Sequence, residues 1–231
     1  MKIAILGGGP SGLYFAISMK LRDASHDITV YERNRADDTF GWGVVLSDET
    51  MSNFEENDPV SEKMIRDKFA YWDDVKTVRG EESMTSSGHG FCGIGRKQML
   101  LLLQERAREL GVTLAFETDI TPEKIEELKA SNDLVVAADG LNSKTRSLYE
   151  DKFQPEIDMR KNHFVWLGTH QKFDDAFTFI FEKTEHGWIW AHAYQFDDDT
   201  ATFIVECGPE TYEAFGLIES DRRGLLEIAS K

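Results

Sequence analysis

Apolar and polar positions follow two different periods along this chain, and the period changes near residue 160. Before that point, short apolar runs are followed by stretches in which apolar residues recur every three or four positions. After it, apolar residues recur at every second position in segments spaced about twelve residues apart. The first pattern predicts alternating strands and helices, and the second predicts an antiparallel sheet.

The N-terminal segment predicts a strand, a glycine-rich turn, a helix and a second strand. An apolar run occupies residues 2–6 and is followed by a glycine-rich segment that ends at Gly12. Apolar residues then recur at helical spacing as far as Arg22, and a second strand-like run covers residues 27–32 and ends at Glu32. Such a unit joins two parallel strands through a right-handed crossover.

Further elements follow before residue 140. The spacing predicts a helix over 96–110, a strand over 112–116, a helix over 122–130 and a strand over 134–138 that is buried on both faces. Residues 37–90 show little clean periodicity, and we expect mostly loop with short helices there.

Four period-two segments, each separated from the next by turn-forming residues, predict the antiparallel strands: 163–170, 176–183, 187–194 and 200–207. The predicted fold class is therefore α/β with two parts. Residues 1–160, with a loop-rich insertion at 37–95, form a Rossmann-like domain with a parallel sheet, and residues 161–231 form an antiparallel sheet.

Charge and composition exclude several functional classes. The 231 residues carry 26 basic and 42 acidic side chains, a net charge of −16, which repels nucleic acid and anionic membranes. Two cysteines predict neither a disulfide framework nor a zinc site, and no metal site is expected. The first apolar run is too short for a membrane span or a signal peptide. We expect a cytoplasmic protein with no nucleic-acid or membrane partner; its oligomeric state is left open.

The glycine-rich turn has the spacing of a dinucleotide-binding loop. The first glycine permits the tight turn, the second lets a pyrophosphate approach the backbone, and the third allows close helix packing. Glu32 lies twenty residues beyond Gly12, where a carboxylate can accept hydrogen bonds from a ribose. The residues predicted to bind the dinucleotide here are Gly7, Gly9, Pro10, Ser11, Gly12, Glu32 and Arg33.

A second motif indicates which dinucleotide is bound. The strand over 134–138 ends in Asp139-Gly140, followed by Ser143 and Arg146. This segment resembles the Asp-Gly motif of the single-component (class A) flavin-dependent aromatic monooxygenases, which are built like para-hydroxybenzoate hydroxylase. Arg96, which opens a predicted helix, matches the flavin-contacting arginine of that family. The resemblance implies FAD, with NADH or NADPH as electron donor and a flavin C4a-hydroperoxide that hydroxylates an aromatic substrate with O₂.

Three further segments, 41–47, 88–93 and 166–169, make the resemblance narrower. They are similar to the hydroxylase parts of enzymes acting on salicylyl-CoA and 2-aminobenzoyl-CoA, and to a violacein-pathway hydroxylase. The resemblance implies an aromatic acyl-CoA or a tryptophan-derived substrate. It adds four residues to the expected cofactor site: Gly43, Val44, Arg96 and Asp139.

The predicted strand over 187–194 carries the candidate substrate residues. Period two places Trp190, His192 and Tyr194 on one face with Trp188, and this aromatic, partly polar surface suits a flat ring held by one hydrogen bond. Ordinary packing of a sheet face explains the same pattern. It is the interpretation we favour for Trp188 and Trp190 and for a neighbouring row of phenylalanines, Phe177, Phe179 and Phe181, while both interpretations stay open for His192. The sequence assigns no catalytic residue.

Members of the resembled family continue beyond the length of this chain, through a Gly-Asp segment that contacts the flavin. A chain truncated at this point is expected to bind FAD weakly and to turn over poorly. Two alternatives therefore stay open: a flavin or nicotinamide oxidoreductase that inserts no oxygen, and a flavin-binding module without activity.

Overall fold

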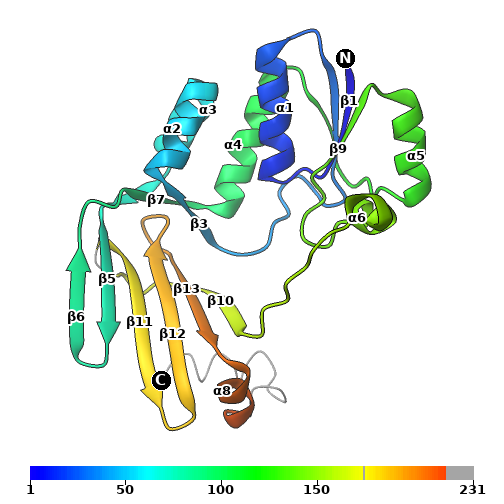
Figure 1. Cartoon of the computed structure of the whole chain (residues 1–231). Helices are drawn as coiled ribbons and strands as arrows, with labels where there is room; N and C mark the ends of the chain where they lie inside the picture. The colour runs from blue at the N-terminus through cyan, green and yellow to red at the C-terminus, as the bar shows by residue number, and fades with distance from the viewer. Residues whose placement is uncertain (174, 217–231) are drawn as a thin grey trace. The chain divides into compact units, whose positions relative to one another are not determined.

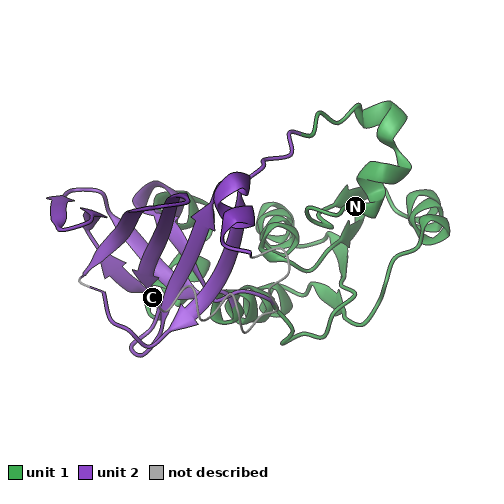
Figure 2. Ribbon diagram, turned by 90° about the horizontal axis from the view of Figure 1, so that it is seen from below, with its two compact units in different colours: residues 1–39, 52–67, 97–157 green, residues 40–51, 68–96, 158–231 purple. Residues whose placement is uncertain are grey.

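The computed structural model describes residues 1–173 and 175–216, which form two compact units (Figure 2). Each unit is assembled from three segments of the chain rather than from one. The first unit contains Met1–Thr39, Ser52–Asp67 and Lys97–Ile157; the second contains Phe40–Met51, Lys68–Arg96 and the chain from Asp158 onward. The predicted division at residue 160 differs from these units in residues 40–51, 68–96 and 158–160.

The first unit is built on a four-stranded parallel sheet (Figure 1). Its strands, in spatial order, are β8 (Thr113–Ala115), β2 (Asp27–Tyr31), β1 (Lys2–Leu6) and β9 (Leu134–Ala137). Leu6 lies in register with Tyr31 on one side and with Ala137 on the other. The residues that follow β1, β2 and β9 therefore lie together at one edge of the sheet.

Strand β1 is buried on both faces, which explains its continuous apolar run. Ala4 and Leu6 pack against Ile125 and Leu128 of α5 (Pro122–Ser131). Ile5 faces the other way, toward Gly12 of α1 (Pro10–Arg22). Full burial of each such aliphatic side chain contributes about 1.5–3 kcal/mol.

The remaining helices of the first unit are short, apart from α4 (Arg96–Glu109). Its Arg106 side chain donates to both carboxylate oxygens of Asp58, at 2.8 and 2.9 Å. Asp58 stands at the N-terminus of α3 (Pro59–Arg66) and is almost fully buried. The shorter helices are α2 (Asp48–Asn57), α6 (Lys144–Leu148) and α7 (Glu150–Phe153).

The second unit contains a six-stranded sheet of order β10-β13-β12-β11-β5-β6. Its strands are β10 (His163–Thr169), β13 (Ala201–Cys207), β12 (Gly187–Gln195), β11 (Ala176–Thr184), β5 (Asp74–Arg79) and β6 (Glu82–Ser86). The four period-two segments are all strands, as the sequence predicts. The sheet is not purely antiparallel, however, because β5 joins β11 in parallel.

A three-stranded antiparallel sheet of order β3-β7-β4 completes the strands of the second unit: β3 (Gly43–Ser47), β7 (Phe91–Gly95) and β4 (Ala70–Trp72). Two of its glycines allow close packing within the unit. A Cβ atom on Gly43 would collide with the Phe196 ring, and one on Gly93 would collide with the carbonyl oxygen of Gln195. The short helix α8 (Pro209–Ala214) follows β13.

The prediction that residues 37–90 are mostly loop is wrong, but the short helices expected there are confirmed. This segment supplies β3, β4, β5, β6 and the helices α2 and α3. Local pattern does not reveal its strands, because they are mostly half-buried or exposed and lack the alternation that marks a strand with one dry face. In addition, β3 pairs with β7 and β5 pairs with β11, and both partners lie far along the chain. Among the described residues, no helix has both the length and the apolar character needed to cross a membrane.

Candidate functional site

The glycine loop of the first unit occupies the turn between β1 and α1, as predicted. Gly7 has a φ of 111°, which disfavours a side chain, and a Cβ atom there would overlap the carbonyl group of Ala138. A Cβ atom on Gly12 would overlap the carbonyl oxygen of Gly7. These two glycines therefore serve the packing of the turn against β9 and against α1.

Gly9 differs from both, because a Cβ atom placed on it would meet nothing within 4 Å. It precedes α1, its backbone is extended, and no side chain caps the helix at this end. Pro10 opens the helix without an N–H group, and Ser11 follows it, exposed. The N–H groups of a helix's first turn have no partner within the helix, and they favour anions. The open space at Gly9 therefore lies beside the backbone N–H groups at the start of α1, which can donate to an anion.

Glu32 lies at the same edge, directly after β2. Its Oε2 accepts a hydrogen bond from the Gly8 N–H at 2.8 Å, and its Oε1 accepts one from the Asn34 N–H at 2.8 Å. These two bonds fix the carboxylate against the glycine loop, while each oxygen keeps a further lone pair for a hydroxyl group. Arg33 is exposed beside it.

Asp139 follows β9 at this edge, but its carboxylate is occupied locally. Oδ1 accepts from the Ser143 hydroxyl at 2.6 Å, and Oδ2 accepts from the N–H and the hydroxyl of Thr145 at 3.1 and 3.2 Å. Burial would raise the pKa of Asp139, but these hydrogen bonds outweigh it and the pKa is lowered. Asp139 thus holds the start of α6 and shapes the turn at Gly140, whose φ is 80°.

The second unit contains the other residues predicted to contact the cofactor. The Gly43 N–H donates to Thr202 Oγ1 at 3.0 Å, and its carbonyl accepts from the Tyr194 hydroxyl at 2.8 Å. Its backbone is therefore engaged within the unit; Val44, next to it on β3, is half-buried. The Arg96 guanidinium lies 4.4 Å from the centre of the Phe40 ring.

The predicted substrate residues lie on one face of β12, which we call the aromatic face. The strand register places Phe179 opposite His192 and Phe181 opposite Trp190 on this same face. The ring centres of His192 and Phe179 are 5.0 Å apart. The imidazole of His192 has no hydrogen-bond partner among the described residues, so it can bond a ligand.

The other two predicted substrate residues have partners of their own. Tyr194 is 5% exposed and bonded to Gly43, so its hydroxyl is committed to holding β3. Trp190 donates its indole N–H to Glu206 Oε2 at 3.2 Å. Trp190 and Tyr194 therefore shape the face, and of the three predicted substrate residues His192 is the one whose side chain has no hydrogen-bond partner among residues 1–173 and 175–216.

The sequence did not predict a role in these sites for several residues. Gly8, Asn34 and Thr145 contribute through their backbone N–H groups, which leave no signal in residue type. Phe177 and Phe179, for which the sequence favours packing of a sheet face, are half-buried and their rings lie against His192. Their spacing of two residues predicts that these side chains share one face of the strand, but it does not predict whether that face is covered or exposed.

Comparison with known proteins shows similarity in sequence to three curated monooxygenases. The chain is 40% identical over 182 residues to salicyloyl-CoA 5-hydroxylase of a Streptomyces species, covering 78% of this chain and 34% of that protein. It is 33% identical over 234 residues to protodeoxyviolaceinate monooxygenase of Chromobacterium violaceum, covering 100% of this chain and 61% of that protein. A third is 3-hydroxy-4-methyl-anthranilyl-[aryl-carrier protein] 5-monooxygenase of Streptosporangium sibiricum, 29% identical over 73% of this chain and 46% of that protein.

Solved structures with the same fold include flavin-dependent enzymes. A tetrameric 2-methyl-3-hydroxypyridine-5-carboxylic acid oxygenase superimposes with a TM-score of 0.71 at 17% identity, covering 90% of this chain and 59% of that one. A probable FAD-dependent monooxygenase from Pseudomonas aeruginosa gives 0.68 at 14% identity, covering 93% and 62%. No model of a protein family matches the chain.

The chain is thus similar in sequence to aromatic monooxygenases and has the fold of the flavin-dependent monooxygenases. It spans between about a third and three-fifths of the length of the curated relatives it matches.

Proposed function

We propose that the chain forms the FAD-binding part and the substrate-facing sheet of a monooxygenase that hydroxylates an aromatic ring. The observation that carries this proposal is the open space beside Gly9, at a sheet edge where unpaired helix amides and the Glu32 carboxylate lie together. When bound, FAD would supply oxygen chemistry with O₂ and with electrons from NADH or NADPH.

The residues at this edge of the sheet in the first unit fit two polar groups of a dinucleotide, its pyrophosphate and a ribose. The pyrophosphate would lie against Gly9 and accept hydrogen bonds from the backbone amides of Ser11 and Gly12. A ribose hydroxyl would donate to Glu32, which the Gly8 N–H already holds in place. Asp139 would act by positioning the turn at Gly140.

The residues of the second unit would orient the aromatic substrate. His192 would hydrogen-bond a hydroxyl or amino substituent of the ring, while Phe179 and Trp190 provide flat contact and exclude water. Gly43, Val44 and Arg96 stay predictions as flavin contacts. The half-buried Arg96 guanidinium can supply fixed donors to an anionic or carbonyl oxygen.

The substrate we propose is an aromatic acid carried as a thioester. Two of the three curated relatives are named for such substrates, one on coenzyme A and one on a carrier protein. The third is named for protodeoxyviolaceinate, which keeps a tryptophan-derived compound as the alternative.

The partner is thus a small molecule, and a net charge of −16 supports neither nucleic acid nor an anionic membrane. We also propose the cytoplasm as its location.

Replacement of Gly9 tests the cofactor site. Gly9→Val places a side chain where a pyrophosphate would lie, without a clash inside the protein. We expect FAD binding, followed by flavin fluorescence, to weaken about tenfold or more. The matched control is Gly208→Val, because Gly208 also precedes a helix opened by proline, has the same extended backbone, and also has open space at Cβ.

Equal FAD binding by the two variants and the unaltered chain would contradict the proposed site. The activity itself is read from products by mass spectrometry, with a panel of aromatic thioesters and indoles, NAD(P)H and O₂. Because a chain of this length is expected to turn over poorly, we expect a small yield of a product heavier by one oxygen atom with the chain and with Gly208→Val, and none with Gly9→Val. Turnover that proceeds without O₂ and yields no hydroxylated product would favour an oxidoreductase that inserts no oxygen.

A further inference from the structure

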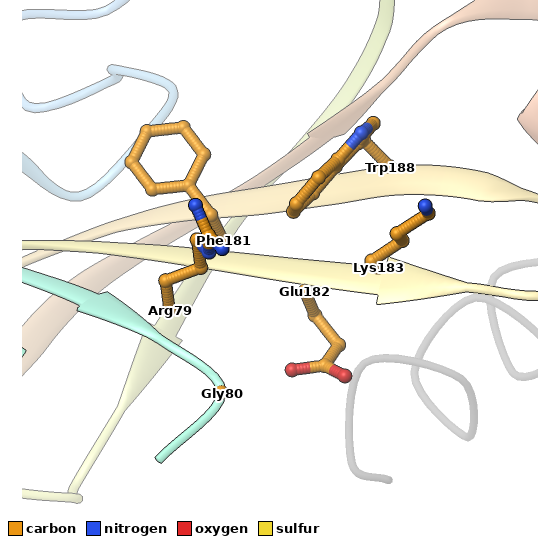
Figure 3. Close-up of a pocket in the computed structure, with 6 residues that line it drawn as sticks. All are labelled: Arg79, Gly80, Phe181, Glu182, Lys183 and Trp188. Carbon is orange, nitrogen blue, oxygen red and sulfur yellow. The ribbon is translucent and has the colours of Figure 1, made fainter. Parts of the chain in front are cut away.

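A hollow of about 310 Å³ lies at the end of the aromatic face where β11 and β12 join (Figure 3). It is away from the Tyr194 end of β12, which holds β3. Its largest exposed ring is Trp188, which is 42% exposed although it is one of the bulkiest apolar side chains. The residues that line it are Arg79, Gly80, Phe181, Glu182, Lys183 and Trp188.

The register of the strands explains how two cations and two rings meet there. Arg79 at the end of β5 is the neighbour of Phe181 on β11, and Lys183 on β11 is opposite Trp188 on β12. These four side chains therefore belong to the aromatic face, whereas Glu182 points to the opposite side of the sheet (Figure 3).

The two cations are notable in a chain with 42 acidic and 26 basic residues. Neither Arg79 nor Lys183 forms an ion pair or a side-chain hydrogen bond with any described residue, even though Glu82 is opposite Arg79 across β5 and β6. Elsewhere, Lys144 is paired with Asp119. Unpaired positive charge beside exposed rings favours a ligand that has both an anionic group and a flat ring.

The position of the hollow indicates how such a ligand relates to the reacting ring. Trp188 is four residues from His192 on the same face of β12, which corresponds to roughly 13 Å along the strand. A free aromatic acid cannot bridge that separation. A substrate joined through a long flexible arm to a phosphorylated base can do so.

We propose that the hollow binds the nucleotide end of coenzyme A, with Arg79 and Lys183 pairing with its phosphates and Trp188 stacking on its adenine. This inference rests on the proposed thioester substrate and names the residues that would recognise its carrier. A phosphopantetheine arm on a carrier protein shares the phosphate but lacks the base, so the exposed Trp188 ring favours coenzyme A.

Calorimetric titration of the chain with coenzyme A tests the proposal, and it needs neither FAD nor turnover. We expect saturable binding that weakens about tenfold or more in the double variant Arg79→Gln/Lys183→Gln, because two charge-assisted contacts are lost. The matched control is Arg160→Gln/Lys161→Gln, which removes the same charge from two exposed positions and should leave binding unchanged. All four positions are exposed, so both double variants are expected to fold.

Two further titrations separate this site from others. Trp188→Ala should weaken binding of coenzyme A but not of 4′-phosphopantetheine; an equal effect on both would contradict the nucleotide assignment. Gly9→Val should bind coenzyme A as the unaltered chain does, and loss of binding would place the nucleotide at the glycine loop instead. Unchanged affinity in the Arg79→Gln/Lys183→Gln variant would overturn the site even if Gly9→Val shows that FAD binds as proposed.

Discussion

The hydroxyl group of Tyr194 shows how one side chain can look like a substrate contact in the sequence and serve another purpose in the fold. It lies in an aromatic strand beside His192, yet it is buried and donates to the carbonyl group of Gly43. Burial also raises the pKa of Tyr194, so the phenol stays protonated as a donor. The neighbouring His192, without such a partner, is the better candidate for binding a substrate.

Removal of the Tyr194 hydroxyl tests this role. Tyr194→Phe leaves the Gly43 carbonyl without that donor, and we expect the free energy of unfolding to fall by about 1–3 kcal/mol in urea titration. Tyr212→Phe is the control, because no hydrogen bond of its hydroxyl is found among the described residues and its ring stacks on His163. An equal change in both variants would show that the bond to Gly43 contributes nothing specific.

At the scale of elements, distant segments are joined by contacts that local pattern does not reveal. Asp58 at the start of α3 accepts hydrogen bonds from Arg106 of α4 and from Ser61, and both charged groups are largely buried. Burial would raise the pKa of Asp58, but the hydrogen bonds from Arg106 and Ser61 outweigh this effect and the pKa is lowered. The pair ties two helices of the first unit together.

Breaking this pair should be costly. Asp58→Ala leaves the Arg106 charge buried without a partner, and we expect the free energy of unfolding to fall by about 3–5 kcal/mol at pH 7. Lys63→Gln is the control, since it breaks an exposed pair with Asp67, which caps the C-terminal end of α3, and should cost less than about 1 kcal/mol.

The same pair gives a pH dependence with a definite sign. The pKa of Asp58 is lower in the folded state than in the unfolded state. The ionised carboxylate therefore stabilises the fold fully above the unfolded-state pKa of about 3.9, and this stabilisation is lost as the pH falls through the folded-state pKa. The difference in stability between the unaltered chain and Asp58→Ala should therefore narrow in strong acid. A difference that stays constant down to the folded-state pKa would contradict this assignment.

The second sheet shows why some elements could not be predicted. β5 and β6 have exposed or half-buried positions and weak alternation, and β5 finds its partner β11 about a hundred residues later in the chain. In contrast, β10 to β13 follow one another through short connections and show clear alternation. The alternation therefore identifies β10 to β13 as strands, whereas neither the β5–β6 hairpin nor the parallel pairing of β5 with β11 can be read from it.

At the scale of the whole molecule, the dominant electrostatic feature is the net charge of −16. Like charges repel one another more in a folded chain than in an expanded one, so the excess of carboxylates opposes folding at neutral pH. At 0.1 M, salt largely screens the repulsion between exposed charges that lie farther apart than the Debye length of about 10 Å.

Stability should consequently rise with ionic strength. We expect the melting temperature in calorimetry to increase by a few degrees between low salt and about 0.5 M NaCl at pH 7. Near the isoelectric point, at about pH 4.8, the same addition should have little effect because the net repulsion is gone. A melting temperature that falls with salt at pH 7 would show that attractive ion pairs outweigh the repulsion.

The sequence by itself determined the strand–glycine–helix unit, the helix that begins at Arg96 and the four alternating strands, because periodicity, turn chemistry and the conformational needs of Gly7 act over a few residues. Only the tertiary structure decided that β5 pairs with β11, that Tyr194 holds Gly43, and that Arg79 lines the same hollow as Lys183 and Trp188. Such contacts join residues far apart in the chain, and they depend on burial and hydrogen bonding summed over a whole unit, which no local window of sequence contains.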